Sequence, residues 1–246
     1  MELSIVIPVR NEAPNIAPLV AEIRAALDGR IAYEIIYVDD GSSDRTAEEI
    51  ERLRRDFPAL RLVRHRARAG QSAAVRSGVK AALAPWIATL DGDGQNDPAD
   101  LPRLWAMALA QPDAARLLIA GQRARRRDSA VKRYSSRIAN GVRRRALGDE
   151  TPDTGCGLKL FSRALYLDLP FFDHQHRFLP ALVLREGGRV VSVPVNHRPR
   201  ERGTSNYGTL DRLWVGITDL VGVMWLKRRA GRAVVQDEGY RFSDER

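Results

Sequence analysis

The chain has 246 residues, enough for one substantial hydrophobic core but too few to favour a second independent domain. Its single cysteine, Cys156, excludes an internal disulfide, which fits a reducing compartment, and no apolar stretch reaches the roughly 18–20 residues of a spanning helix. The net charge of +9 suits nucleic acid, anionic lipid or phosphorylated substrates. No signal peptide is expected, because the first apolar run breaks at Pro8.

Strands and helices are predicted to alternate along the first 121 residues. Runs of β-branched, aromatic and other apolar residues predict five strands, at residues 3–8, 33–38, 60–63, 86–90 and 116–120. Apolar residues recur at helical spacing over residues 15–27 and 47–57, and a third helix opens at Gly70. This alternation predicts a mostly parallel α/β sheet flanked by helices.

Acidic and polar residues follow three of these strands directly. The segments are RNE at residues 10–12, DDGS at 39–42 and DGDGQNDP at 91–98. The carboxyl ends of parallel strands meet at one edge of a sheet, so these residues predict a ligand site there. Asp91 and Asp93, two residues apart beside glycines, offer oxygen ligands for Mg²⁺ or Mn²⁺. An Asp-Gly turn alone is also ordinary loop chemistry, but three acidic strand ends favour a site.

The second half is more basic. Arginines cluster at residues 123–127, 143–145, 198–202 and 227–229. After a basic helical stretch at 129–147, the sequence predicts a glycine-rich turn that leads into residues 158–161. A helix near 176–186, a strand at 189–195 and a helix over 210–226 are predicted to follow.

The last predicted helix has an amphipathic pattern. Its apolar residues fall on one face: Leu213, Trp214, Ile217, Leu220, Val221, Met224 and Trp225. Two tryptophans and a basic end at 227–229 favour a helix lying at a membrane interface. A helix that packs on the core or at a dimer interface is the alternative. Residues 230–246 are predicted to be a polar tail.

Four segments together resemble the family-2 glycosyltransferases, which have a GT-A (Rossmann-like) fold: SIVIPVRNEAPNI, VDDGSSDRT, AGQSAAVRSG and DGDGQNDP. The chain is most similar to the dolichol-phosphate mannosyltransferase type, which moves a sugar onto a polyprenyl phosphate. Asp91, Asp93, Gln95 and Pro98 match the family's D-x-D-x-Q pattern and the proline after it. The resemblance covers residues 3 to about 228. It implies one domain over 1–229, divided into a nucleotide-sugar half (1–121), an acceptor half with a lid loop (122–208) and an interface helix (209–229).

The resemblance implies a site for a UDP- or GDP-linked sugar. It assigns contacts to the base and ribose to five residues: Pro8, Arg10, Glu12, Val38 and Asp40. Carboxylates such as Glu12 and Asp40 accept hydrogen bonds from ribose hydroxyls and base N–H groups. Asp93 and Gln95 are the expected metal ligands, with Asp91 on the ribose or on the metal through water, and Gly92 between the carboxylates. A divalent metal stabilises the charge on a leaving diphosphate, so Asp91 and Asp93 are candidate catalytic residues.

A loop over residues 198–208 resembles the R-x-x-G-x-S-K lid that closes over the donor phosphates in this family. It implies roles for Arg200, Arg202 and Ser205, although Asn206 replaces the family's lysine. A glycine- and serine-containing loop with arginines suits a mobile, anion-binding lid.

The acceptor decides whether a general base is needed. A polyprenyl phosphate is already anionic and needs positive charge instead. By resemblance, Arg123, Lys132 and Ser136 would hold that phosphate, and Arg123 is a third candidate catalytic residue. The alternative is that this basic helix simply faces water or lipid headgroups.

A saccharide hydroxyl acceptor would instead need Asp153 or Asp173 as a base. Asp153 otherwise serves to orient the acceptor site or to cap the turn. His174 and His176 form an H-x-H pattern that could bind zinc from a strand, but further ligands at suitable spacing are missing.

The sequence therefore predicts a metal-dependent, inverting transferase that makes a polyprenyl-phosphate-linked (undecaprenyl type) monosaccharide for envelope glycan assembly. We expect a peripheral protein at the cytoplasmic face of the cell membrane, with a membrane-protein partner or a second copy as open alternatives. A transferase acting on a saccharide hydroxyl is the second hypothesis. A non-catalytic nucleic-acid or anionic-lipid binding module is the third, and the acidic strand ends oppose binding to a phosphate backbone. The residues leave the sugar open among mannose, glucose and galacturonate.

Overall fold

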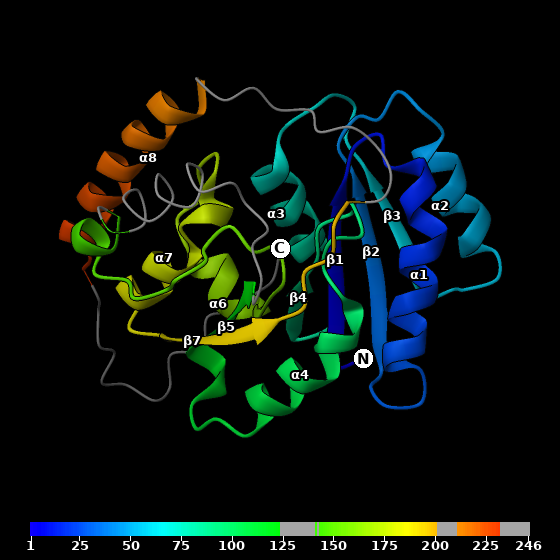
Figure 1. The fold of residues 1–246 in the computed structure, drawn as a ribbon, viewed down its shortest axis with the longest axis horizontal. Coiled ribbons are helices and arrows are strands. Elements are labelled where there is room, and N and C mark those ends of the chain that lie inside the picture. The colour runs from blue at the N-terminus through cyan, green and yellow to red at the C-terminus, as the bar shows by residue number, and fades with distance from the viewer. Residues whose placement is uncertain (124–140, 142, 201–210, 232–246) are drawn as a thin grey trace, which may run out of the picture.

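The computed structural model describes residues 1–123, 141, 143–200 and 211–231 (Figure 1). In this part of the chain seven strands form one sheet in the order β3-β2-β1-β4-β6-β5-β7. The strands are β1 (Leu3–Val9), β2 (Tyr33–Asp39), β3 (Leu60–Arg64), β4 (Trp86–Thr89), β5 (Leu117–Arg123), β6 (Lys159–Ser162) and β7 (Arg189–Val195). Six of the seven match strands predicted from the sequence, with ends that differ by a few residues, whereas β6 was not predicted as a strand. The mixed α/β fold is confirmed.

Most of the sheet is parallel. β1 pairs in parallel with β2 and β4, β2 with β3, and β5 with β7. β6 is the exception, because it lies antiparallel between β4 and β5. This insertion brings Lys159 opposite Thr89, two residues before Asp91.

Helices cover both faces of the sheet, so its central strands are buried on both sides. On one face lie α1 (Ala13–Leu27), α2 (Thr46–Arg54) and α4 (Leu101–Leu109), which pack on Leu3, Ile5 and Ile7 of β1. On the other lie α3 (Gln71–Ala81), α6 (Arg163–Asp168), α7 (Leu179–Arg185) and α8 (Asp211–Arg228), in a cluster that includes Val6. Alternation along β1 follows from the period of two in a strand. Three short 3₁₀ turns complete the described elements: η1 (Pro98–Asp100), η2 (Ala114–Arg116) and η3 (Gln175–Arg177).

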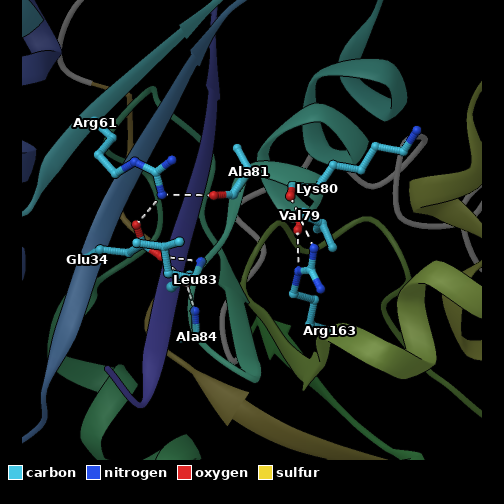
Figure 2. Close-up of polar contacts among 9 residues, drawn as sticks. Glu34, Arg61, Val79, Lys80, Ala81, Leu83, Ala84 and Arg163 are labelled. Carbon is cyan, nitrogen blue, oxygen red and sulfur yellow. Dashed lines mark hydrogen bonds and ion pairs between the residues drawn. The ribbon is translucent and has the colours of Figure 1, made fainter. Parts of the chain in front are cut away.

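A polar network fixes α3 at the amino-terminal end of the parallel strands (Figure 2). The buried Glu34 carboxylate accepts hydrogen bonds from Arg61 Nη1 (2.6 Å) and Leu83 N (2.7 Å). Arg61 also donates to the Ala81 carbonyl (2.8 Å), and Arg163 donates to the Val79 carbonyl (3.0 Å). Cationic side chains thus satisfy the last carbonyls of α3 and oppose the negative end of its dipole. The opposite end of α3, which begins at Gln71, is held at the strand ends where the predicted site lies.

Helix α8 forms where the sequence predicts it, and the core covers only one edge of its apolar face. Val223 is buried, and Leu220 and Met224 pack against the second core cluster. Ile217 and Trp225 lie further round the helix, with 47% and 59% of their surface exposed. The side chains of Leu213 and Trp214 lie outside the described part. Among the described helices, none is both long and apolar enough to cross a membrane.

Candidate active site

Two adjoining cavities open at the carboxyl ends of β1, β2 and β4. The smaller cavity has a volume of about 250 Å³ and is lined by Pro8, Val9, Arg10, Glu12, Asp40, Arg68, Gly70, Gln71, Ala74, Asp91, Gly92, Asp93 and Arg200. It gathers nearly all described residues that the resemblance assigned to the donor. Val38 is an exception, since it is fully buried in the core beneath α3. Arg202 lies outside the described residues.

The larger cavity, of about 460 Å³, continues from the smaller one. Five residues line both cavities: Pro8, Arg68, Gly70, Gln71 and Asp91. Beyond this junction the larger cavity is lined by Lys159, Asp173, His174, His176 and Arg177, among others. The sequence predicted no role for Arg68, Gln71, Lys159 or Arg177, because their position at this cavity depends on the order of the strands and not on a local motif.

Asp91 stands at the junction and is tightly positioned. Gln71 Nε2 donates to its Oδ1 (3.0 Å), and the Asp91 amide donates to the Asn96 side chain (2.9 Å). A Cβ added at Gly157 would lie 2.5 Å from Asp91 Oδ1, so the carboxylate occupies space that only glycine leaves open. Burial and the neighbouring Asp93 charge raise the pKa of Asp91 to about 6. Neighbouring carboxylates such as Asp91 and Asp93 repel each other, and a bound cation would neutralise their charges.

The oxygen ligands here suit a hard divalent cation. Asp93 Oδ1 accepts a hydrogen bond from the Gln95 amide (3.1 Å), which orders the turn. Gln95 Nε2 donates to the Arg198 carbonyl (3.3 Å), a bond that does not use the amide oxygen, and Gln95 lines neither of the two cavities. Among the described residues, no three carboxylate, imidazole or thiol groups are arranged so that they alone could hold a metal ion. A cation held by Asp93, Gln95 and Asp91 would therefore need water and diphosphate oxygens to complete its shell, as Mg²⁺ commonly does.

Glu12 and Arg200 meet across the smaller cavity. Arg200 Nη2 donates to Glu12 Oε1, while Asn15 Nδ2 donates to Glu12 Oε2 (2.6 Å). Burial outweighs these contacts and raises the pKa of Glu12. Nearby, Arg198 forms a two-pronged ion pair with Glu22 of α1 (2.6 and 3.2 Å). The first residues of the predicted lid are thus tied to the nucleotide half; Ser205 and the rest of the lid lie outside the described residues.

Asp40 organises the segment that carries Arg68. Its Oδ1 accepts hydrogen bonds from His65 Nδ1 and the Ala69 amide (both 2.7 Å), and its Oδ2 accepts one from the Gly70 amide (2.8 Å). Burial opposes the charge, but these three hydrogen bonds hold the pKa of Asp40 below its usual value. Gly70 has a φ of +92°, which favours glycine, at the start of α3. This positioning role of Asp40 was not predicted from the sequence.

Arg123 is paired with a neighbouring carboxylate. Its Nε and Nη2 donate to Asp153 Oδ2 and Oδ1, both at 2.7 Å, and this pairing raises the pKa of Arg123. A bidentate ion pair neutralises both groups. It leaves Asp153 ill suited as a general base and Arg123 partly neutralised as a phosphate ligand. Lys132 and Ser136, the other predicted acceptor ligands, lie outside the described residues.

The H-x-H pattern does not lie on a strand. His174 has a φ of +62° and precedes η3, which carries His176. His174 Nδ1 faces Asp219 Oδ2 of α8 (3.0 Å), whereas His176 Nδ1 faces Ser72 Oγ of α3 (2.7 Å). Because the two rings bind different partners, they do not form a chelating pair for zinc.

Comparison with known families and proteins identifies relatives over most of the chain. The model of glycosyl transferase family 2 matches residues 4–169. The chain is 35% identical over 241 residues to dodecaprenyl-phosphate galacturonate synthase of Rhizobium johnstonii, covering 94% of this chain and 69% of that protein. It is 34% identical over 210 residues to undecaprenyl-phosphate 4-deoxy-4-formamido-L-arabinose transferase of Edwardsiella ictaluri, covering 85% of this chain and 63% of that protein. The chain thus spans about two thirds of the length of these relatives.

Solved structures share the fold. Glucosyl-3-phosphoglycerate synthase from Mycobacterium tuberculosis, in complex with Mn²⁺, uridine diphosphate and phosphoglyceric acid, aligns with a TM-score of 0.67 at 19% identity. The alignment covers 94% of this chain and 80% of that one. At such an identity the likeness establishes a common fold and leaves the reaction to be argued from the site.

Proposed function

The chain belongs to glycosyl transferase family 2, and from that membership we propose that it transfers a sugar from a nucleoside diphosphate to a polyprenyl phosphate. The observation that carries the proposal is the pair of cavities joined at Asp91: one is lined by the carboxylates of Asp91 and Asp93, and the other has basic residues along its wall. The names of both relatives describe transfer to a polyprenyl phosphate, which supports this acceptor. The uridine diphosphate in the solved neighbour favours a UDP-linked donor.

The donor's diphosphate is proposed to lie in the smaller cavity. Asp93, Gln95 and Asp91 would hold Mg²⁺ or Mn²⁺, which supplies charge stabilisation to the departing diphosphate. Arg10, Arg68 and Arg200 line the same cavity and add positive charge around the phosphates. Glu12 suits a ribose hydroxyl or a base N–H group, since its carboxylate already accepts hydrogen bonds there.

The acceptor is proposed to attack from the larger cavity with inversion at the anomeric carbon. A phosphate oxygen carries its own negative charge, so no residue has to remove a proton. Among the described lining residues, the only carboxylates in this cavity are Asp91 and Asp173, and the Asp173 side chain is 68% exposed. The pairing of Asp153 with Arg123 further weakens the hydroxyl-acceptor hypothesis, which requires a base.

We propose that the protein works peripherally at the cytoplasmic face of the cell membrane, where a polyprenyl phosphate is presented. Helix α8 would lie on the bilayer through its exposed residues Ile217, Val221 and Trp225. Its last turn carries Lys227 and Arg228, suited to anionic headgroups. The division into a nucleotide half, an acceptor half and an interface helix is part of the same proposal.

The test is transfer in the presence of Mn²⁺, undecaprenyl phosphate and a panel of UDP- and GDP-sugars, read by mass spectrometry of the lipid phase. The variant Asp93→Ala should abolish transfer while the protein still unfolds cooperatively near the wild-type temperature. Asp97→Asn is the matched control, because Asp97 belongs to the same segment but lines neither cavity. Full activity in Asp93→Ala, or an equal loss in Asp97→Asn, would refute the site.

A further inference from the structure

The wall of the larger cavity holds hydrogen-bond donors to which the proposed function assigns no individual substrate group. They come from Lys159 on β6 and from His176 and Arg177 on η3, and these three residues are called the basic wall below. Each carries a polar N–H group, and each lines the same cavity as Asp91. Their chemistry indicates what part of a substrate they face.

Ser72 fixes the tautomer of His176. Ser72 Oγ accepts a hydrogen bond from the His176 amide (3.1 Å) and lies 2.7 Å from His176 Nδ1. We assign the hydroxyl proton to the bond with Nδ1, which places the ring's own proton on Nε2. Burial, together with the charges of Lys159 and Arg177, lowers the pKa of His176 to about 3, which keeps the ring neutral. Nε2 has no partner among the described residues and is not sealed away from solvent, so its N–H opens toward the cavity.

Arg177 supplies the charge beside this donor. Its amide donates to the His174 carbonyl (3.0 Å), but its guanidinium makes no hydrogen bond or ion pair within the described part of the chain. Lys159 is only 4% exposed, and its ammonium donates to the carbonyls of Thr154 (3.3 Å) and Cys156. An ammonium has three protons, so one more can be given to a ligand. Burial lowers the pKa of Lys159, and an anion at this wall would favour its charged form.

The basic wall therefore presents an uncommitted guanidinium, a buried ammonium and a neutral N–H to one space. A neutral hexose would leave the two cations facing hydroxyl groups, whereas a carboxylate would accept charge-assisted hydrogen bonds from all three. The larger cavity continues, at Asp91 and Gln71, from the smaller cavity in which the diphosphate is proposed to lie. A sugar attached to the diphosphate is the first group to enter it.

We propose that the basic wall binds a carboxylate on the transferred sugar, so that the donor is a nucleoside-diphosphate hexuronic acid. This inference rests on the proposed function and narrows its donor. The two curated relatives differ on this point, since one is named for galacturonate and the other for a formamido-arabinose. The basic wall favours the acidic sugar.

Calorimetric titration in Mn²⁺ without acceptor tests the inference. UDP, UDP-galactose and UDP-galacturonate are compared for the wild type, Arg177→Gln and Arg177→Lys. We expect UDP-galacturonate to bind about 10- to 100-fold more tightly than UDP-galactose. Arg177→Gln should remove that preference without changing the affinity for UDP, and Arg177→Lys should restore part of it. Arg66→Gln is the control, because Arg66 is an exposed residue that carries the same charge and lines neither cavity.

Three results would count against the inference. Equal binding of the two sugars by the wild type would overturn it and leave the proposed function standing. If Arg177→Gln instead raised the KM for undecaprenyl phosphate with the sugar preference intact, the basic wall would belong to the acceptor phosphate. If UDP failed to bind with Mn²⁺, the proposed function itself would fall, and the inference with it.

Discussion

Replacing Gly157 with alanine should displace the Asp91 carboxylate without removing any side chain of the site. Gly157 lies in the turn before β6, and Thr89 Oγ1 of β4 donates to its carbonyl (2.6 Å). A Cβ at this position would lie 2.5 Å from Asp91 Oδ1 and close to the rest of that carboxylate. Carbon and oxygen atoms that are not bonded do not approach so closely, so the side chain of Asp91 has to move.

The structure sets the size of the effect. Restoring an ordinary contact requires a shift of about 1 Å, and a misplacement of that size in a reacting group can cost about 100-fold in rate. The shift also breaks the hydrogen bond from Gln71 Nε2 to Asp91 Oδ1. We therefore expect Gly157→Ala to lower kcat/KM by about 100-fold. Overpacking of a well-packed site costs about 1–3 kcal/mol, so thermal unfolding should still be cooperative.

Gly155→Ala in the same turn is the matched control. A Cβ there would meet the end of the flexible Arg123 side chain at 3.3 Å, a contact that a small adjustment relieves. Its kcat/KM should stay close to the wild-type value in the lipid-phase transfer assay. If Gly157→Ala kept wild-type kcat/KM, or if Gly155→Ala lost as much activity, the close approach of residue 157 to Asp91 would not be what positions that carboxylate.

Two further predictions concern stability and membrane binding. Burial raises the pKa of Glu34, but hydrogen bonds from Ser4, Arg61 and Leu83 outweigh it and hold the value below the usual 4.5 (Figure 2). The ionised carboxylate thus stabilises the fold above pH 4.5 and loses that contribution as the pH falls through its lowered pKa. In urea unfolding at neutral pH, Glu34→Ala should lower the free energy of unfolding by about 3 kcal/mol. Glu51→Ala is the control, because Glu51 forms an exposed pair with Arg54, and its free energy of unfolding should hardly change. Equal losses in the two variants would contradict this reasoning. Trp225→Ser should weaken sedimentation of the protein with anionic vesicles and leave UDP binding unchanged. Leu109→Ser, at an equally exposed apolar residue of α4, should change neither property. If Trp225→Ser sedimented as well as the wild type, α8 would not be the element that contacts the membrane.

Local sequence patterns were sufficient to predict much of the fold. The strand runs, the helical spacing of α1 and the acidic segment after β4 each depend on residues close together in the chain. Their periodicities report burial directly, because a strand alternates every second residue and a helix returns every 3.6. The same local information predicted that Asp91 and Asp93 meet the ends of β1 and β2 at one edge, since parallel strands place their carboxyl ends together.

The apolar pattern of residues 210–226 shows where such reasoning fails. Helical spacing placed Leu220 and Trp225 on one face, yet Leu220 packs on the core and Trp225 is exposed. A wide apolar stripe does not say which part of it another element will cover. That depends on how α8 approaches α7, and their contact is a property of the assembled core.

By itself, the sequence determined the α/β class, every strand of the sheet except β6, and the acidic segment at the sheet edge, because each is encoded in the spacing of neighbouring residues. Only the tertiary structure decided the antiparallel insertion of β6, which sets Lys159 beside Asp91, and the contact of His176 with Ser72, 104 residues away. It also decided the pairing of Arg123 with Asp153. Such contacts arise when distant elements compete for the same partners, so their outcome depends on the packing of the whole chain and not on any local pattern.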